Sequence, residues 1–142
     1  RLKNKMQKPK GFTIIELIVV IAIIAVLAAI VLVNVTQYIN KGKDAAIKGN
    51  MANLVTISAA WYDDPTHNKY GGLTNDPTYS SGITSINSAN GTGAVTSQIR
   101  TDNTAWCVQS TLNDITVANW CVDSTGYKGN TAACDATNAN CN

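Results

Sequence analysis

The feature that most constrains this chain is an unbroken apolar run of 17 residues from Leu17 to Val33. Extended back to Phe12, the run has 22 residues and is interrupted only by Thr13 and Glu16. A helix of about 20 apolar residues can cross the hydrocarbon core of a bilayer, which is roughly 30 Å thick. The run therefore predicts a membrane-spanning helix, and the acid near its start requires an explanation.

Charge is distributed unequally along the chain. Residues 1–10 hold five of the eleven basic side chains and no acidic one, whereas the remaining 132 residues hold six basic and nine acidic side chains, a net charge of −3. A short cationic segment beside an apolar helix is expected to stay on the cytoplasmic side of the membrane. The folded part lacks the basic surface that nucleic-acid binding requires, so the charge pattern does not favour a nucleic acid as partner.

Residues 1–11 are predicted to be a leader peptide. Initiation at Met6 would leave the leader MQKPKG. An ordinary secretory signal is cut after small residues that follow the apolar run, but here the run is followed by NVTQYINKGKDAA. The small residue instead precedes the run, at Gly11. A cut after Gly11 would keep the apolar helix on the mature chain and make Phe12 its N-terminus.

Helical periodicity continues beyond the membrane run. Apolar, aromatic and small side chains recur at helical offsets, at Ile47, Met51, Leu54, Val55, Ser58, Trp61 and Tyr62. The opposite face is predicted to carry Lys43, Asp44, Lys48, Asn50 and Asn53. Because the residue before a proline disfavours the helical region, Asp64-Pro65 should end the helix. A single helix from Phe12 to Tyr62 would be roughly 75 Å long, so its apolar half must be buried outside a domain of this size.

The C-terminal part predicts a small sheet. Residues 66–104 are rich in Thr, Ser, Asn and Gly and are expected to be mostly loop. The similar segments AWCVQSTL (105–112) and NWCVDSTG (119–126) are expected to pair as antiparallel strands, with Cys107 opposite Cys121. The predicted fold is α+β, a long N-terminal helix with a small antiparallel sheet in a C-terminal head. The predicted parts are the leader (1–11), the apolar helix (12–34), its amphipathic continuation (35–64) and the head (65–142).

The four cysteines all lie in the last 36 residues, at Cys107, Cys121, Cys134 and Cys141. An even number of cysteines beyond a membrane segment indicates an oxidising exterior and two disulfides. Three pairings are open, of which we favour Cys107 with Cys121 and Cys134 with Cys141. No CxxC spacing indicates zinc.

Catalysis and metal binding find little support in the remaining residues. The single histidine, His67, lies in a polar segment and forms no recognisable Ser/His/Asp or Cys/His set. Two groups of oxygen-bearing residues could be weighed as calcium ligands, but neither has EF-hand spacing; they are Asp63, Asp64 and Asp76, and Asp135, Asn138 and Asn140. We expect a protein without catalysis, cofactor or metal.

Glu16 allows two interpretations. As an ordinary first-turn acid it would interact favourably with the helix dipole, and the chain would be a tethered exterior domain. If the chain is cut after Gly11, however, the new amine of Phe12 lies four residues before Glu16. A carboxylate in an apolar medium is costly unless it is paired. The amine of a neighbouring copy would pair with Glu16 in one axial register only, which predicts self-assembly.

The segment KGFTIIELIVVIAIIAVLAAI resembles the N-terminus of type IV pilins and of type II secretion pseudopilins. The resemblance rests on a short cationic leader that ends in Gly11, on Phe12 after it, on an acid fifth in the mature chain at Glu16, and on the apolar run. It implies a prepilin that spans the cytoplasmic membrane once. A prepilin peptidase would cut between Gly11 and Phe12 and methylate the amine of Phe12.

The resemblance also implies a function. Separate ATPase-driven machinery would assemble the subunits into a helical homo-oligomer whose core is the apolar helices, and Glu16 would help to register each incoming subunit. We expect a structural subunit of a type IV pilus, displayed as a filament on the cell surface. The alternatives are a type II secretion pseudopilin and a minor pilin at the filament tip that binds DNA or surfaces.

Overall fold

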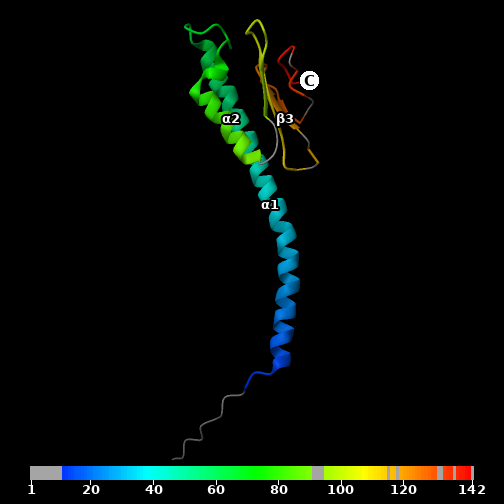
Figure 1. The fold of residues 1–142 in the computed structure, drawn as a ribbon. Helices are drawn as coiled ribbons and strands as arrows, with labels where there is room; N and C mark the ends of the chain where they lie inside the picture. The colour runs from blue at the N-terminus through cyan, green and yellow to red at the C-terminus, as the bar shows by residue number, and fades with distance from the viewer. Residues whose placement is uncertain are drawn as a thin grey trace, which may run out of the picture. The chain divides into compact units, whose positions relative to one another are not determined.

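The computed structural model describes residues 11–90, 95–114, 116–117, 119–130, 133–135 and 137–141. Figure 1 shows its elements in chain order: α1 (Ile14–Asp63), the 3-10 helix η1 (Leu73–Asn75), α2 (Pro77–Asn90), β1 (Val95–Ile99), β2 (Trp106–Thr111), β3 (Asn119–Asp123) and β4 (Lys128–Gly129). The predicted α+β fold is confirmed. Residues 1–10 of the predicted leader lie outside the described residues.

The chain divides into an N-terminal unit, Arg1–Gln37, and a C-terminal unit, Tyr38–Asn142. Helix α1 contributes residues to both units, and its bounds lie within two residues of those predicted. Pro65 explains the C-terminal end, because the residue before a proline is driven out of the helical conformation.

In the C-terminal unit, α1 buries one face. Its buried residues recur every three or four positions, at Asp44, Ile47, Met51, Leu54 and Ser58, which is the spacing of one helix face. Two predictions about this helix are wrong: Tyr62 is exposed, and Asp44, expected on the polar face, is buried. Position 44 precedes position 47 by three residues and therefore lies on the buried face.

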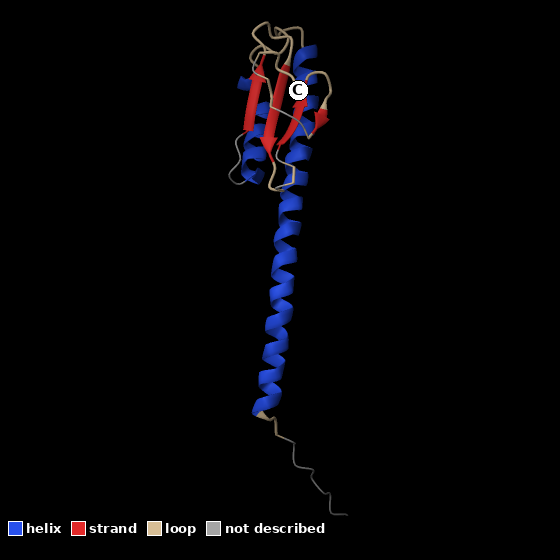
Figure 2. Cartoon of the chain, turned by 90° about the vertical axis from the view of Figure 1, so that its right-hand side faces the viewer, coloured by secondary structure: helices blue, strands red, loops and turns tan. Residues whose placement is uncertain are grey.

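The four strands form one antiparallel sheet in the order β1-β2-β3-β4. Figure 2 shows this sheet in red with the helices behind it. Alternate side chains of β2 and β3, including Trp106, Val108 and Val122, point toward the helices and complete a core with Ile47, Met51, Leu54, Tyr70, Leu73, Tyr79 and Ile86. This face of the sheet thus buries the apolar surface that α1 presents in this unit.

Helix α2 lies in the segment that we expected to be loop, so that expectation is wrong. Asp76 precedes the helix, and its Oδ1 accepts a hydrogen bond from the amide of Tyr79 at 2.7 Å, with Pro77 in the first helical position. Both are preferred at a helix start. Gly82 allows close packing on α1, since a Cβ atom there would lie 2.6 Å from Cδ2 of Leu54. Tertiary packing therefore supports a helix whose Ser- and Thr-rich sequence is a weak helix former.

The opposite face of the sheet is covered by the C-terminal segment, to which it is joined by two disulfides. Cys107 pairs with Cys134 and Cys121 pairs with Cys141, so the favoured pairing is wrong. The strand register gives the reason. Cys107 lies opposite Asp123, and Cys121 lies opposite Gln109, which is a shift of two residues from the predicted register. Both cysteines keep the same face of the sheet, but they are not opposite each other, and each reaches the overlying segment.

Candidate processing and assembly site

Helix α1 begins in a reciprocal hydrogen-bonding arrangement between Thr13 and Glu16. The amide nitrogen of Thr13 donates to Glu16 Oε2 at 2.9 Å, and the Thr13 hydroxyl donates to the same oxygen at 2.8 Å. The amide of Glu16 donates to Thr13 Oγ1 at 3.4 Å. The first helical hydrogen bond, from Leu17 N to Thr13 O, is 3.3 Å long. Thr13 is therefore the N-cap of α1, and Thr13-x-x-Glu16 is a capping box.

The capping box gives Glu16 a partner within its own chain. Both hydrogen bonds from Thr13 end on Oε2. They hold the carboxylate in place, and Oε1 can accept a hydrogen bond from another chain. The two interpretations of Glu16 drawn from the sequence, a first-turn acid near the helix dipole and a partner for the amine of a neighbouring copy, did not include Thr13. The pattern Thr-x-x-Glu before an apolar run was the signal that could have revealed it.

The residues before the cap lie outside the helix. Gly11, Phe12 and Thr13 have no regular secondary structure, and 79% of the Phe12 surface is exposed. The predicted cleavage point, the peptide bond from Gly11 to Phe12, is therefore on an exposed, non-helical stretch directly before α1.

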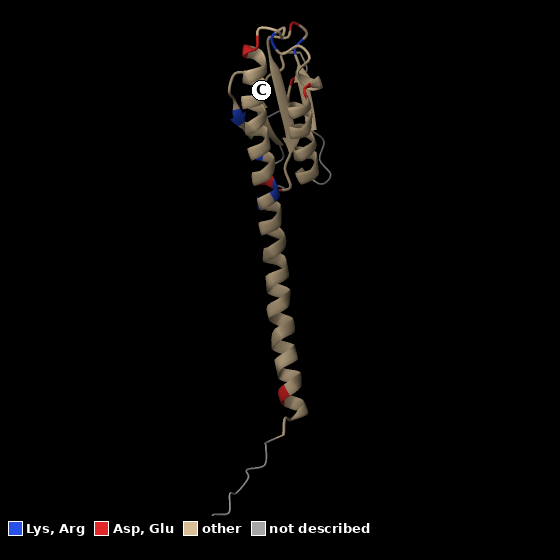
Figure 3. Cartoon of the chain, turned by 90° about the vertical axis from the view of Figure 1, so that its left-hand side faces the viewer, with Lys and Arg blue, Asp and Glu red and all other residues tan. Residues whose placement is uncertain are grey.

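The N-terminal unit exposes an apolar surface on all sides of α1. The large apolar side chains from Phe12 to Val35 have 45% to 80% of their surface exposed. Figure 3 shows how the charges are placed, with one acid near the start of α1 and a long uncharged stretch after it. Of the described helices, α1 is long and apolar enough to cross a membrane by length and composition. A helix that is apolar all round must be buried in lipid or protein.

This apolar surface has a shallow hollow along one side. The hollow has a volume of about 360 Å³ and is lined by Val19, Ala22, Ile23, Val26 and Leu27. A small residue such as Ala22 between bulky ones lets the backbone of a second helix approach closely. The surface can thus receive a helix as well as lipid.

In the C-terminal unit, Asp44 is a buried carboxylate that joins α1 to the loop between β2 and β3. Its Oδ1 accepts hydrogen bonds from the amide and side-chain nitrogens of Asn113 at 2.7 and 3.0 Å, and its Oδ2 accepts one from the amide of Asp114 at 2.9 Å. These three donors make the burial of the charge tolerable.

Lys48, four residues further along α1 than Asp44, places its Nζ atom 4.6 Å from the centre of the Trp120 ring.

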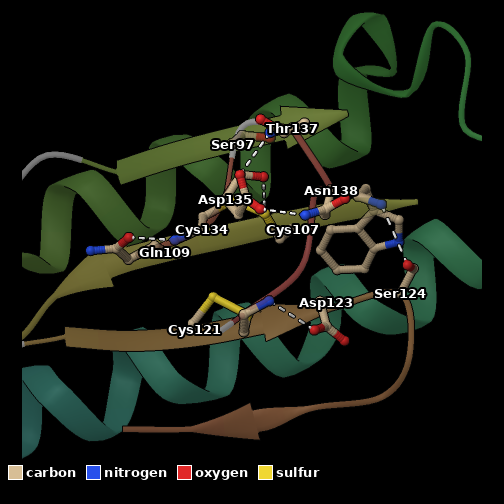
Figure 4. Close-up of a disulfide and its surroundings, with 12 residues drawn as sticks. Ser97, Cys107, Gln109, Cys121, Asp123, Ser124, Cys134, Asp135, Thr137 and Asn138 are labelled. Carbon is tan, nitrogen blue, oxygen red and sulfur yellow. Dashed lines mark hydrogen bonds between the residues drawn. A yellow bond between two sulfur atoms is a disulfide. The ribbon is translucent and has the colours of Figure 1, made fainter. Parts of the chain in front are cut away.

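A second buried carboxylate, Asp123, holds the C-terminal segment against the sheet. Its Oδ2 accepts a hydrogen bond from the amide of Cys141 at 3.0 Å. Nearby, the side-chain oxygen of Gln109 accepts one from the amide of Cys134 at 2.8 Å. Figure 4 shows both contacts beside the cysteines. Two side chains of the sheet, Gln109 and Asp123, thus accept hydrogen bonds from the backbone of the C-terminal segment next to the disulfides.

In each of the two groups considered as calcium ligands, one carboxylate accepts hydrogen bonds from residues close to it in the sequence. Asp135 accepts hydrogen bonds from the amide of Thr137 and the side chain of Asn138, and Asp64 accepts two from Thr66. Among the described residues, no three His, Cys, Asp or Glu side chains are grouped so that they could hold a metal ion.

His67 packs as a structural residue at the end of α1. Its ring stacks on Trp61 with 3.5 Å between ring centroids and 4° between planes. Its Nδ1 lies 3.3 Å from the carbonyl oxygen of Trp61. The Trp61 indole donates to the carbonyl oxygen of Gly71 at 3.3 Å. The histidine therefore closes the helix end, and the Trp61 indole ties that end to the next loop.

Comparison with known proteins bears on the N-terminal unit. Residues 6–32 match the family model described as the prokaryotic N-terminal methylation motif. Searches of the curated proteins and of the solved structures each gave no match.

The motif is the prepilin signal of type IV pilins and pseudopilins, and the long apolar helix α1 that follows it fits a protein of that type. The motif implies processing by a prepilin peptidase and assembly by pilus or secretion machinery, and the apolar helix implies membrane anchoring of the precursor.

Proposed function

We propose that this protein is the building subunit of a type IV pilus. The observation that carries the proposal is the exposed apolar surface of α1 together with a carboxylate at its start, within a segment that matches the prepilin signal. Such a surface is stable in the membrane before assembly and is buried among the helices of other subunits afterwards. The filament therefore exchanges lipid contacts for helix contacts.

The proposed processing fits the start of the chain. A prepilin peptidase cuts between Gly11 and Phe12, and the new amine of Phe12 is methylated. Glu16 then accepts the amine of a neighbouring subunit through Oε1 while Oε2 stays in its capping box. Because an unpaired charge among apolar helices is costly, this contact admits one axial register.

The C-terminal unit is proposed to be the part exposed on the filament surface. The two disulfides support this placement, because they pair all four cysteines and such bonds persist in the oxidising exterior of the cell. The protein is further proposed to act as a structural subunit without catalysis of its own. Supporting this, His67 is engaged in stacking and in closing a helix end.

The proposal is tested by intact mass spectrometry on protein sheared from the cell surface, with and without reductant. The expected mass starts at Phe12, includes one added methyl group, and rises by four hydrogen atoms on reduction, two for each disulfide. Gly11→Val is the matched control and should leave an uncut precursor in the membrane fraction. Protein that is cut after Gly11 but absent from the sheared fraction would favour a pseudopilin, and protein left uncut in the wild type would exclude both.

A further inference from the structure

We propose that Thr13 is a positioning residue for leader removal, because its capping box keeps the peptide bond between Gly11 and Phe12 outside helix α1. This inference rests on the proposed cleavage after Gly11. It assigns Thr13 and Glu16 a role before assembly, in the precursor. Two observations support it: the pair of reciprocal hydrogen bonds between the two residues, and the non-helical state of residues 11–13.

The N-cap fixes which carbonyl receives the first helical hydrogen bond. With Thr13 as N-cap, that bond runs from Leu17 N to Thr13 O, and the carbonyl of Gly11 takes no part in the helix. If the helix began two residues earlier, Gly11 would become the N-cap, a position that glycine accepts readily. The amide of Ile15 would then donate to the carbonyl oxygen of Gly11.

That change would protect the bond that must be broken. In the hydrolysis, a water oxygen adds to the carbonyl carbon of Gly11, the bond from that carbon to Phe12 N breaks, and the leaving nitrogen takes up a proton. The products are a carboxylate at Gly11 and an amine at Phe12. During the addition, negative charge develops on the carbonyl oxygen, which hydrogen-bond donors of the peptidase must be able to reach. If the carbonyl oxygen of Gly11 is already hydrogen-bonded to Ile15 N and points along the helix axis, the donors of the peptidase cannot reach it.

The capping box is independent of the cut itself. Its donors are the amide and hydroxyl of Thr13 and the amide of Glu16, and none of these groups is altered when the Gly11–Phe12 bond is hydrolysed. The same hydrogen bonds can therefore present the scissile bond in the precursor and orient Glu16 in the mature subunit.

The test uses full-length precursor in detergent with a purified prepilin peptidase. Thr13→Val keeps the size and branching of the side chain but removes the hydroxyl. It is expected to lower kcat/KM for cleavage by up to about fivefold, because a typical N-cap free energy changes the ratio of the two helix starts by about that factor. Thr13→Ser, which keeps the hydroxyl, should restore the wild-type rate. Thr36→Val is the matched control, because Thr36 lies in the same helix and its hydroxyl donates to the carbonyl of Leu32 instead of a cap.

A second readout separates positioning from direct recognition. Backbone carbon chemical shifts of Gly11, Phe12 and Thr13 in micelles report where the helix begins. In Thr13→Val the shifts should move toward helical values, and in Thr13→Ser they should not. Slow cleavage without that movement would mean that the peptidase contacts Thr13 directly, and cleavage of Thr13→Val at the wild-type rate would mean that the cap is irrelevant. Either result overturns the inference but leaves the proposed function intact, whereas wild-type precursor that is never cut after Gly11 overturns the proposed function.

Discussion

At the scale of single residues, Glu16 combines a local and an intermolecular role, and substitution can separate them. Glutamine is accepted at this position of a capping box, so Glu16→Gln keeps an acceptor for the Thr13 amide but removes the charge. The uncharged side chain cannot neutralise an amine from another subunit.

We therefore predict that Glu16→Gln inserts into the membrane normally but lowers the filament yield by more than about tenfold, because leaving one partner of a buried ion pair alone costs several kcal/mol. The measurement is the amount of subunit in the sheared fraction relative to the membrane fraction. Thr36→Val serves as control for a change in the same helix. Wild-type filament yield from Glu16→Gln would refute the charge pairing.

Asp44 gives a prediction about the C-terminal unit alone. Asp44→Ala removes the acceptor of three hydrogen bonds, so that the amides of the half-buried residues Asn113 and Asp114 lose their partner. Hydrogen bonds to a charged group are worth more than neutral ones, so the free energy of unfolding should fall by about 3 kcal/mol. The exposed Asp63→Ala is the control and should change it little.

This effect is measured by urea denaturation of the full chain in micelles. All three tryptophans, Trp61, Trp106 and Trp120, lie in the C-terminal unit, so their fluorescence follows the unfolding of that unit. Equal denaturation midpoints for Asp44→Ala and Asp63→Ala would show that the buried carboxylate contributes nothing to stability.

At the scale of elements, the sequence predicted α1 better than any other element. The apolar run and the periodic positions Ile47, Met51 and Leu54 make one strong pattern, and Asp64-Pro65 marks its end. In α2 the pattern is weak, because Tyr79 and Ile86 are its two large buried side chains and most other positions are Ser, Thr or Asn. The start signal Asp76-Pro77 was present, but it carries little weight without a periodic apolar face.

The register of β2 and β3 was not predictable for a physical reason. Shifting the pairing by two residues keeps every side chain on the same face of the sheet, so hydrophobic patterning cannot distinguish the two registers. The register is fixed by contacts between residues distant in sequence, such as the hydrogen bond from the amide of Cys141 to Asp123. In the candidate site, the residues Gly11, Phe12 and Glu16 could be named from the motif. The pattern Thr13-x-x-Glu16 could also have revealed the capping box, but the structure was needed to show which carboxylate oxygen receives its hydrogen bonds.

The disulfide pairing is open to a direct test by peptide mapping. Cleavage before Asp102, Asp114, Asp123 and Asp135 places each of the four cysteines in a different peptide. Under non-reducing conditions we expect peptide 102–113 joined to 123–134, and 114–122 joined to 135–142. Peptide 102–113 joined to 114–122 would instead support the pairing favoured from the sequence and would contradict the register of the sheet.

At the scale of the whole molecule, the acidic side chains differ between the two units. The N-terminal unit has Glu16 as its only acid, whereas the C-terminal unit has eight aspartates. Five of these form the same local turn, in which Asp Oδ1 accepts a hydrogen bond from the amide of a threonine two residues later; they are Asp64, Asp102, Asp114, Asp123 and Asp135. Low pH should therefore lower the free energy of unfolding of the C-terminal unit.

Hydrogen bonds from threonine lower the pKa of four of these carboxyls, with the Thr side chain the larger cause at Asp64 and Asp102 and the Thr amide the larger cause at Asp114 and Asp135. A carboxyl whose pKa is lower in the folded state binds its proton more readily when unfolded. Its contribution to stability is complete above the unfolded pKa of about 3.9, and it is lost as the pH falls through the lower folded pKa. The four groups are exposed, so each contribution is small and is screened by solvent.

We therefore predict that the free energy of unfolding of the C-terminal unit changes little between about pH 7 and pH 5 and falls progressively below about pH 4. Urea titrations followed by tryptophan fluorescence at a series of pH values measure this fall. Thr104→Val removes the hydroxyl that bonds to Asp102 at 2.5 Å, so the loss in acid should become shallower. Thr84→Val is the matched control, because the hydroxyl of Thr84 donates to the carbonyl of Ser80 and not to a carboxylate. If stability is the same at pH 3 and at pH 6, or if the two variants titrate alike, the turns do not govern the acid response.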